Sequence, residues 1–176
     1  MNNKYYPVFD TGQLKTSEIL DLCEKLFPVY CYNRECVDRD FPTPKESTLR
    51  WFKANIEADE EHKDKSANDL EKEGIVGITL RERLLLELNY YSFTGEHLDI
   101  DNITLCAGSR RSYGHVPSVC WDGGLWQVNW YFSDSAYDHL RVREAVSNPF
   151  DSLPLKDKWI EQGEKEGWIS EGKVIK

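Results

Sequence analysis

Alternation of apolar and polar positions is most regular between residues 102 and 132. Three runs there have the length and composition of β-strands: 103–107, 115–121 and 125–132. The last run places four large apolar residues on one face: Trp126, Val128, Trp130 and Phe132. Between the second and third runs, Asp122-Gly123-Gly124 can supply the positive φ angles of a tight hairpin turn. The pattern predicts a three-stranded antiparallel sheet.

A helical period replaces this alternation just before the sheet. Residues 80–93 place four apolar side chains on one helical face: Leu84, Leu85, Leu88 and Tyr91. Thr79 and Glu82 have the spacing of a capping box, and Gly95 follows where a helix end needs positive φ. We expect this capped helix to cover the apolar face of the sheet. The tryptophans of the sheet are then core residues and not a stacking platform for nucleic-acid bases.

Residues 1–75 are expected to form an N-terminal helical extension. A first helix is predicted from Thr16 or Ser17 to about Leu26, because its apolar residues recur at helical spacing. Residues 29–37 fit either a strand or a packed loop. A second helix is predicted from Ser47, with an apolar stripe that ends at Ile56 and a polar, acidic continuation.

The C-terminal part is expected to add a short helix over 137–146 and a tail with a helix near 155–162. The fold class predicted is therefore α+β: a three-stranded antiparallel sheet packed by a capped helix, with the N-terminal helical extension. Three regions follow: 1–75 with the acidic helix, 76–148 as the α+β core module, and 149–176 as the tail.

Charge narrows the function classes. The chain has 22 basic and 31 acidic side chains, for a net charge of −9. This charge argues against direct nucleic-acid binding, which needs a positive field. No apolar run suits a membrane-spanning helix, and the N-terminus lacks the apolar stretch of a secretory signal. Five scattered cysteines are typical of reduced thiols, so a cytoplasmic location is expected.

Acidic residues are concentrated between 57 and 73, where eight acids and three lysines give a local charge of −5. One interpretation is a solvated helix with ion-paired faces. The other is a surface that presents carboxylates to a basic groove in place of phosphates. On that hypothesis five acids contact the partner: Glu57, Asp59, Glu60, Glu61 and Asp64.

The glycine-bounded loop 108–114 is the second candidate binding segment. Its adjacent Arg110 and Arg111 can fork onto a phosphate or carboxylate, or can pair with the surplus acids of the chain itself. Tyr113 lies in the same loop and is included with them among the candidate partner-binding residues.

Catalytic and metal chemistry find little support in the residue spacing. Cys106 or Cys120 with His115 would make a nucleophile pair, but no orienting group or oxyanion donor can be named. Cys31 and Cys36 make half of a metal site at most. Residues 96–101 hold acids and a histidine, without the spacing of a calcium loop. We therefore assign no catalytic residue, metal or cofactor.

Several short motifs occur together between residues 79 and 146. They are Thr79-Leu-Arg-Glu-Arg83, Thr94-Gly-Glu-His-Leu-Asp99, Thr104-Leu-Cys-Ala-Gly-Ser-Arg110, Val116-Pro117, Trp121 and Val128-Asn-Trp-Tyr131. Their combination resembles a small uncharacterised module of phage and prophage accessory proteins. The resemblance implies a mobile-element protein, a setting in which small acidic chains inhibit host defence, as anti-CRISPR proteins do. It carries no catalytic residue.

The leading expectation is thus a non-enzymatic, phage-type binding protein in the host cytoplasm. It would inhibit a host nucleic-acid-binding defence complex, a protein or ribonucleoprotein with a basic groove, through its acidic surface. Arg110 and Arg111 would hold an acidic or phosphate group elsewhere on the target. The alternative is a small enzyme or a phosphate- or carboxylate-binding domain that uses the 106–120 loop. A homo-oligomeric structural protein is a third interpretation.

Overall fold

The computed structural model describes residues 5–148 and, nearer the C-terminus, residues 164–165, 169–170 and 173–174. The chain divides into two compact units, Met1–Ala145 and Val146–Lys176. In the second unit, β8 (Ile169–Ser170) pairs antiparallel with β9 (Lys173–Val174). The helix predicted near 155–162 lies outside the described residues.

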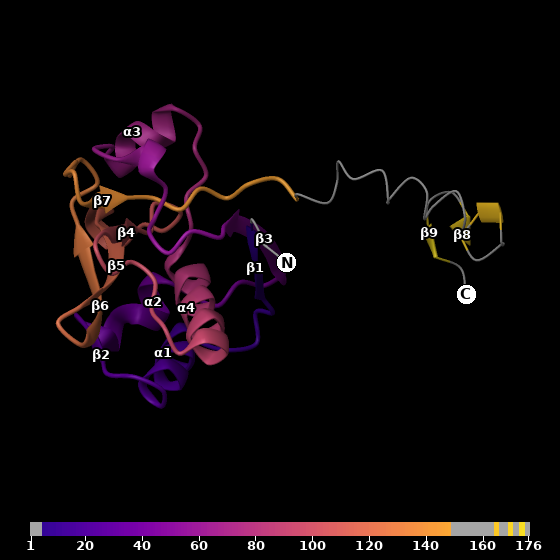
Figure 1. Ribbon diagram of the computed structural model, residues 1–176, viewed down its shortest axis with the longest axis horizontal. Coiled ribbons are helices and arrows are strands. Elements are labelled where there is room, and N and C mark those ends of the chain that lie inside the picture. Colours follow the sequence, from indigo (N-terminus) through magenta and orange to yellow (C-terminus); the bar gives the residue numbers. More distant parts are fainter. Residues whose placement is uncertain (1–4, 149–163, 166–168, 171–172, 175–176) are drawn as a thin grey trace. The chain divides into compact units, whose positions relative to one another are not determined.

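The first unit is built on a five-stranded mixed sheet with the order β2-β6-β5-β4-β7 (Figure 1). Its strands are β2 (Val29–Cys31), β4 (Ile103–Leu105), β5 (Val116–Asp122), β6 (Leu125–Tyr131) and β7 (Leu140–Arg141). The central strands β4, β5 and β6 are antiparallel and correspond to the three predicted strands. Gly123 and Gly124, with φ of 58° and 82°, form the predicted two-residue turn.

The prediction of a three-stranded sheet is wrong in extent. β2 pairs parallel with β6, and β7 pairs parallel with β4. These outer strands contain three and two residues, too few for a period-2 pattern to be read from the chain. They are strands because distant segments bring a partner to them, and the sequence does not display that pairing.

Helix α4 (Leu80–Thr94) has the ends that the sequence predicts. The backbone N–H of Thr79 donates to the Glu82 carboxylate at 2.8 Å, and the N–H of Glu82 donates to Thr79 Oγ1 at 3.2 Å. Gly95 follows in the left-handed region with φ of 72°. The capping box and the glycine C-cap are confirmed.

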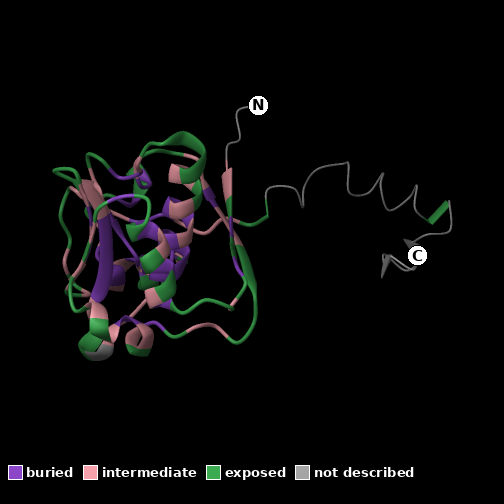
Figure 2. Ribbon diagram, turned by 90° about the horizontal axis from the view of Figure 1, so that it is seen from below, coloured by how far each residue is buried: buried purple, intermediate pink, exposed green. Residues whose placement is uncertain are grey.

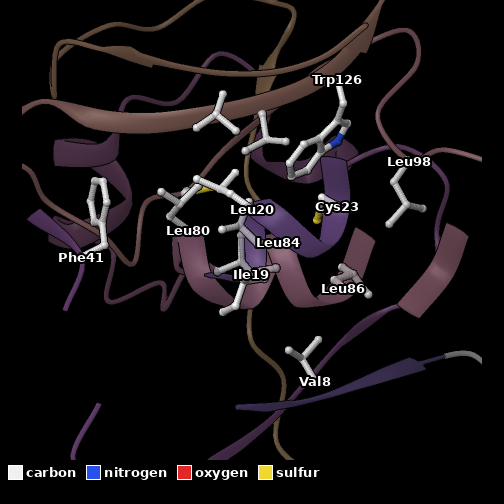
Figure 3. Packing of buried hydrophobic residues seen from close by; sticks show 14 of the residues in the cluster. Val8, Ile19, Leu20, Cys23, Phe41, Leu80, Leu84, Leu86, Leu98 and Trp126 are labelled. Carbon is white, nitrogen blue, oxygen red and sulfur yellow. The ribbon is translucent and has the colours of Figure 1, made fainter. Parts of the chain in front are cut away.

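Helix α4 lies between two β layers (Figure 1). On its far side from the five-stranded sheet, β1 (Tyr5–Asp10) and β3 (Thr48–Lys53) form an antiparallel ribbon. Helix α1 (Thr16–Glu24) packs beside α4. Figure 3 shows Val8 of the ribbon, Ile19 of α1 and Trp126 of the sheet around α4. Buried residues therefore occur on more than one face of α4. Figure 2 shows that buried residues gather in the interior of the first unit, with exposed residues along its outer loops.

The helix predicted from Ser47 is wrong, and so is its acidic continuation. Residues 48–53 form β3, in which Phe52 is buried opposite Tyr6 of β1. The acidic stretch is a loop with one 3₁₀ turn, Glu60–His62, followed by the short helix α3 (Ala67–Lys72). The apolar residues of 49–56 are too few to distinguish a helical stripe from a strand, and the pairing with β1 decides for the strand.

Residues 1–75 are likewise not a separate extension, because α1, β1, β2 and β3 all contribute to the core and sheets of the first unit. Helix α1 confirms the first predicted helix, but Lys15 and not Thr16 or Ser17 is its N-cap. After the strand β2, a 3₁₀ turn (Arg34–Cys36) leads into α2 (Val37–Asp40). Among the described residues no helix is long and apolar enough to cross a membrane.

The helix predicted over 137–146 is wrong too. After β7 the chain stays extended and bonds to two other segments. The carbonyl of Val142 accepts from the backbone N–H of Asp59, and the carbonyl of Arg143 accepts from that of Ile78. Ala145 donates to the carbonyl of Val76 at 2.8 Å. Backbone groups of residues 142, 143 and 145 thus bond to other parts of the chain and not within a helix.

A network of four charged side chains is buried beneath the sheet. Asp99 accepts from Arg83 Nε at 2.9 Å and from an Arg143 Nη at 2.7 Å, while Arg83 also donates to Glu87 at 2.7 Å. The hydroxyl of Thr104 also donates to the Asp99 carboxylate, at 2.5 Å. All four charged side chains are at most 1% exposed, so they must neutralise one another.

His97 extends this network toward the aromatic core. Its Nδ1 lies 2.7 Å from the Glu87 carboxylate, and its ring stacks on Trp121 at a centroid distance of 3.5 Å. The tryptophan face of the sheet is therefore partly covered, as expected: Trp126 and Val128 are fully buried. Phe132, just beyond β6, is exposed, which the alternation did not predict.

Removing one charge from the buried network should greatly lower the denaturant concentration at which the protein unfolds. Asp99→Asn keeps the side-chain shape and tolerates the left-handed backbone, but it leaves buried Arg143 without a counter-charge and Arg83 with Glu87 alone. We expect a loss of about 3–5 kcal/mol in the free energy of unfolding, measured by urea denaturation. The control Asp21→Asn breaks the exposed pair with Arg34 and should cost less than about 1 kcal/mol. Equal losses in the two variants would contradict this account.

Acid should destabilise the fold through the same kind of contact. Burial by itself raises the pKa of Asp99 and of Asp10, but Arg143 and Arg83 for the first, and Arg81 for the second, hold both pKa values below 3.8. A depressed folded-state pKa contributes stability above the unfolded pKa of about 3.9, and that contribution is lost as pH falls further. Urea unfolding from pH 6 to pH 3 should show the loss beginning below about pH 4. In Asp10→Asn the free energy of unfolding should depend less steeply on pH. An unchanged pH dependence in this variant would argue against a contribution from Asp10.

Candidate functional site

A cavity of about 300 Å³ lies where the start of α4 meets β1, β3 and the loop after β4. Six charged side chains line it: Asp10, Asp40, Arg50, Arg81, Glu82 and Arg110. Thr48, Thr79 and Ser109 add hydroxyl groups. The site is therefore polar, and its chemistry depends on which of these charges remain accessible.

Gly108 lets the 108–110 loop lie against the segment that leads into α4. A Cβ on Gly108 would lie 2.3 Å from the carbonyl oxygen of Gly77, so the two backbones can cross this closely only with glycine at position 108. The N–H of Gly108 donates to the Ile78 carbonyl at 3.0 Å. Ser109 Oγ then accepts from the backbone N–H of Leu80, the first residue of α4, at 3.0 Å.

The three carboxylates of the cavity already have partners within the protein. Arg81 donates two hydrogen bonds to Asp10, of 2.8 and 3.0 Å, and Glu82 accepts from the backbone N–H of Thr79 in the capping box of α4. Asp40 accepts from Arg39 at 2.9 Å and from Arg111 at 2.5 Å. Burial raises the pKa of Asp40, but the two arginines outweigh it and keep the pKa below its ordinary range. All three side chains are nearly inaccessible.

Two arginines, by contrast, are about one third exposed: Arg50 at 39% and Arg110 at 33%. Arg50 makes one long contact, 3.4 Å from its Nε to Glu82. Arg110 is anchored by the carbonyl of Ala107 at 2.5 Å and by the exposed Glu71 at 3.2 Å. The accessible charge of the cavity is therefore positive, in a chain whose net charge is −9.

The other residues predicted in the 108–114 loop lie elsewhere. Arg111 forms an ion pair with the nearly inaccessible carboxylate of Asp40. Its guanidinium carbon lies over the ring of Trp130, 3.9 Å from the ring centroid. Tyr113 is 98% exposed and has a φ of 72°. The structure thus separates the two adjacent arginines: Arg110 lines the cavity, and Arg111 holds the loop to the sheet.

The predicted acidic site residues do not form a row of unpaired carboxylates. Glu57 accepts three backbone N–H groups, from residues 100, 101 and 102. Glu60 pairs with Arg141 at 2.5 Å, and Glu61 pairs with Lys53. Asp59 is buried. Asp64 is exposed, with a φ of 59°, and no ion pair is found for it in the described part of the chain.

Later acids of the same stretch are paired as well. Asp69 lies 3.3 Å from Lys72, Glu73 lies 2.5 Å from Lys65, and Glu71 meets Arg110. Three of the pairing cations, Lys53, Arg110 and Arg141, come from outside the stretch. The charge of −5 counted along the chain is therefore offset by cations that the fold brings in.

The cysteine–histidine pair that the sequence suggests is not assembled. Cys106 is fully buried, and burial raises the pKa of its thiol far above the usual range. Burial also raises the pKa of Cys120 to about 11. The ring of His115 packs on Phe132, and no hydrogen bond joins it to either thiol among the described residues. Neither thiol is activated as a nucleophile would need to be.

Within the described residues, one group of three His, Cys, Asp or Glu side chains brings its donor atoms within 4.8 Å of one another: Asp59, Glu61 and His62. Neither Cys31 and Cys36 nor the acids of 96–101 make such a group there. Sequence reasoning overlooked His62, because the stretch was taken for a solvated helix. It also overlooked Arg50 and Arg81, which reach the cavity only through the ribbon and helix.

Fold and cavity together describe an α+β protein with a polar, arginine-bearing cavity at the start of its central helix. No family model, no curated protein and no solved structure matches the chain.

Thiol labelling tests the cysteine assignments directly. With iodoacetamide at neutral pH, Cys23 and Cys106 should stay unmodified in the native protein, since both are buried and burial raises the pKa of the Cys23 thiol to about 12. All five should react in denaturant. Peptide mass spectrometry reads each site, and fast native labelling of Cys106 would restore the nucleophile hypothesis.

Proposed function

We propose that this chain binds a small anionic ligand, one with a carboxylate or phosphate group, in the cavity at the start of α4. One observation carries the proposal: the carboxylates that line the cavity are buried and paired, whereas its accessible charges are the guanidinium groups of Arg50 and Arg110. A ligand with a negative group therefore meets no uncompensated negative charge at the site.

The donors suit such a ligand. A guanidinium presents N–H groups in a planar fork that matches carboxylate and phosphate oxygens. Ser109 accepts from Leu80, so its own hydroxyl hydrogen remains for an acceptor in the cavity. The volume, about 300 Å³, is at the small end of ligand pockets and fits a metabolite-sized molecule. This is the ligand-binding alternative for the 106–120 loop, extended to residues from β3 and α4.

Inhibition of a host defence complex through an acidic surface stays a prediction. Most of the acids proposed for that surface are held by cations or by backbone N–H groups, so presenting them to a partner would require breaking these pairs. This cost makes the cavity the better supported site.

The binding proposal is testable with simple anions. In ¹⁵N–¹H NMR titrations with inorganic phosphate and with acetate, the amide signals of residues 108–110 and 79–81 should shift. Arg50→Gln removes a charged donor worth about 1.5–3 kcal/mol and should weaken binding roughly tenfold or more.

The matched control is Arg34→Gln, which removes an arginine that pairs with exposed Asp21 and Glu24 and does not line the cavity. It should leave the affinity unchanged. Equal weakening by the two variants, or shifts spread over the surface, would mean non-specific attraction and would defeat the proposal.

A further inference from the structure

Two buried side chains in the loop before α3 each leave one polar atom unused. Asp59 is 1% exposed and His62 is 4% exposed. Asp59 Oδ1 and His62 Nδ1 have no hydrogen-bond partner. Buried polar atoms nearly always have a partner, so two unused acceptors in one cluster point to something that binds both.

Glu144, from the extended segment after β7, orients both of these side chains. Its backbone N–H donates to Asp59 Oδ2 at 2.8 Å, and its carboxylate lies 2.8 Å from His62 Nε2. A histidine that donates one ring N–H to a carboxylate keeps a lone pair on the other nitrogen, the arrangement common behind metal-ligating histidines. The atoms left without a partner are Asp59 Oδ1 and His62 Nδ1.

Glu61 supplies a third donor at the surface. Donor atoms of Asp59, Glu61 and His62 lie within 4.8 Å of one another, and bonds of 2.0–2.2 Å to a tetrahedral ion need about 3.4 Å between ligands. Rotation of the Glu61 side chain can shorten its distances to the other two donors. Glu61 is half exposed and pairs with Lys53, so its carboxylate can turn inward at the expense of one surface ion pair.

We propose that Asp59, His62 and Glu61 form a binding site for a divalent transition-metal cation of the zinc class. An imidazole nitrogen with two carboxylate oxygens favours zinc over magnesium or calcium, which prefer all-oxygen sites. Three protein ligands leave the remaining coordination position to water, because the site opens at Glu61. The inference is independent of the anion-binding cavity, since none of the three residues lines it.

The site would also fasten the 59–62 loop to the segment after β7. The backbone N–H of Asp59 already donates to the Val142 carbonyl at 3.0 Å, and Glu144 contacts two of the three ligands. A bound ion therefore stabilises the folded protein by mass action, because the unfolded chain does not hold the three donors together.

Isothermal titration with ZnCl₂ tests the proposal on the full chain. One ion should bind per chain, MgCl₂ should give no comparable binding, and zinc should raise the midpoint of thermal unfolding. Asp59→Asn and His62→Gln should abolish the binding. Glu144→Gln should weaken it by about 10–100-fold, since it removes the carboxylate behind the histidine.

Glu61→Gln decides the matter if the buried variants do not fold, because its side chain is exposed; it should weaken zinc binding. Lys53→Gln frees Glu61 and should tighten binding, whereas Lys63→Gln, which removes a neighbouring exposed charge, should do so less. Titration with CoCl₂ should give absorption of a nitrogen–oxygen site without a thiolate charge-transfer band.

The variants Cys36→Ser and His139→Gln are matched controls, since they remove other metal-binding groups outside the cluster. They should bind zinc as the native chain does. No zinc binding by the native protein, loss of binding in either control, or native affinity in Glu61→Gln would overturn the assignment.

Discussion

The structure depends on a buried ion-pair network of two arginines and two acids. Arg83 and Glu87 come from α4, Asp99 from the connector after it, and Arg143 from the segment after β7. A charge left unpaired at such depth costs several kcal/mol. Each of these segments can therefore pack in its native position only when the others are also in place. The network therefore ties helix, connector and late chain segment into one cooperative unit.

Both proposed sites are attached to this frame. The turn of α4 that carries Arg83 follows directly on the residues that line the cavity, with Arg81 and Glu82 among them. At the other end, Arg143 points into the core while its neighbour Glu144 reaches Asp59 and His62. Fixing one backbone segment for the sake of the core thus also fixes the groups that can hold a ligand.

Charge has a different meaning along the chain and in space. A local count finds a strongly acidic stretch, but Lys53, Arg110 and Arg141 arrive from other elements and pair with it. Conversely, an acidic chain exposes two arginines at one cavity because the carboxylates of Asp10 and Asp40 are occupied by other arginines and that of Glu82 accepts in the capping box of α4. Pairing in three dimensions, and not net charge, decides which groups are available to a ligand.

From the sequence alone, local signals were sufficient for the capped helix α4, its glycine end and the Gly123-Gly124 hairpin, because each depends on residues a few positions apart. Arg110 was named from its loop in the sequence, and the structure places it at the cavity, whereas its role in binding stays a prediction. The strands β2, β3 and β7, the burial of Arg83 and Asp99, and the grouping of His62 with Asp59 and Glu144 join residues far apart in the chain. Only the tertiary structure decides these, because short segments take their conformation, and buried charges their partners, from contacts that no local pattern encodes.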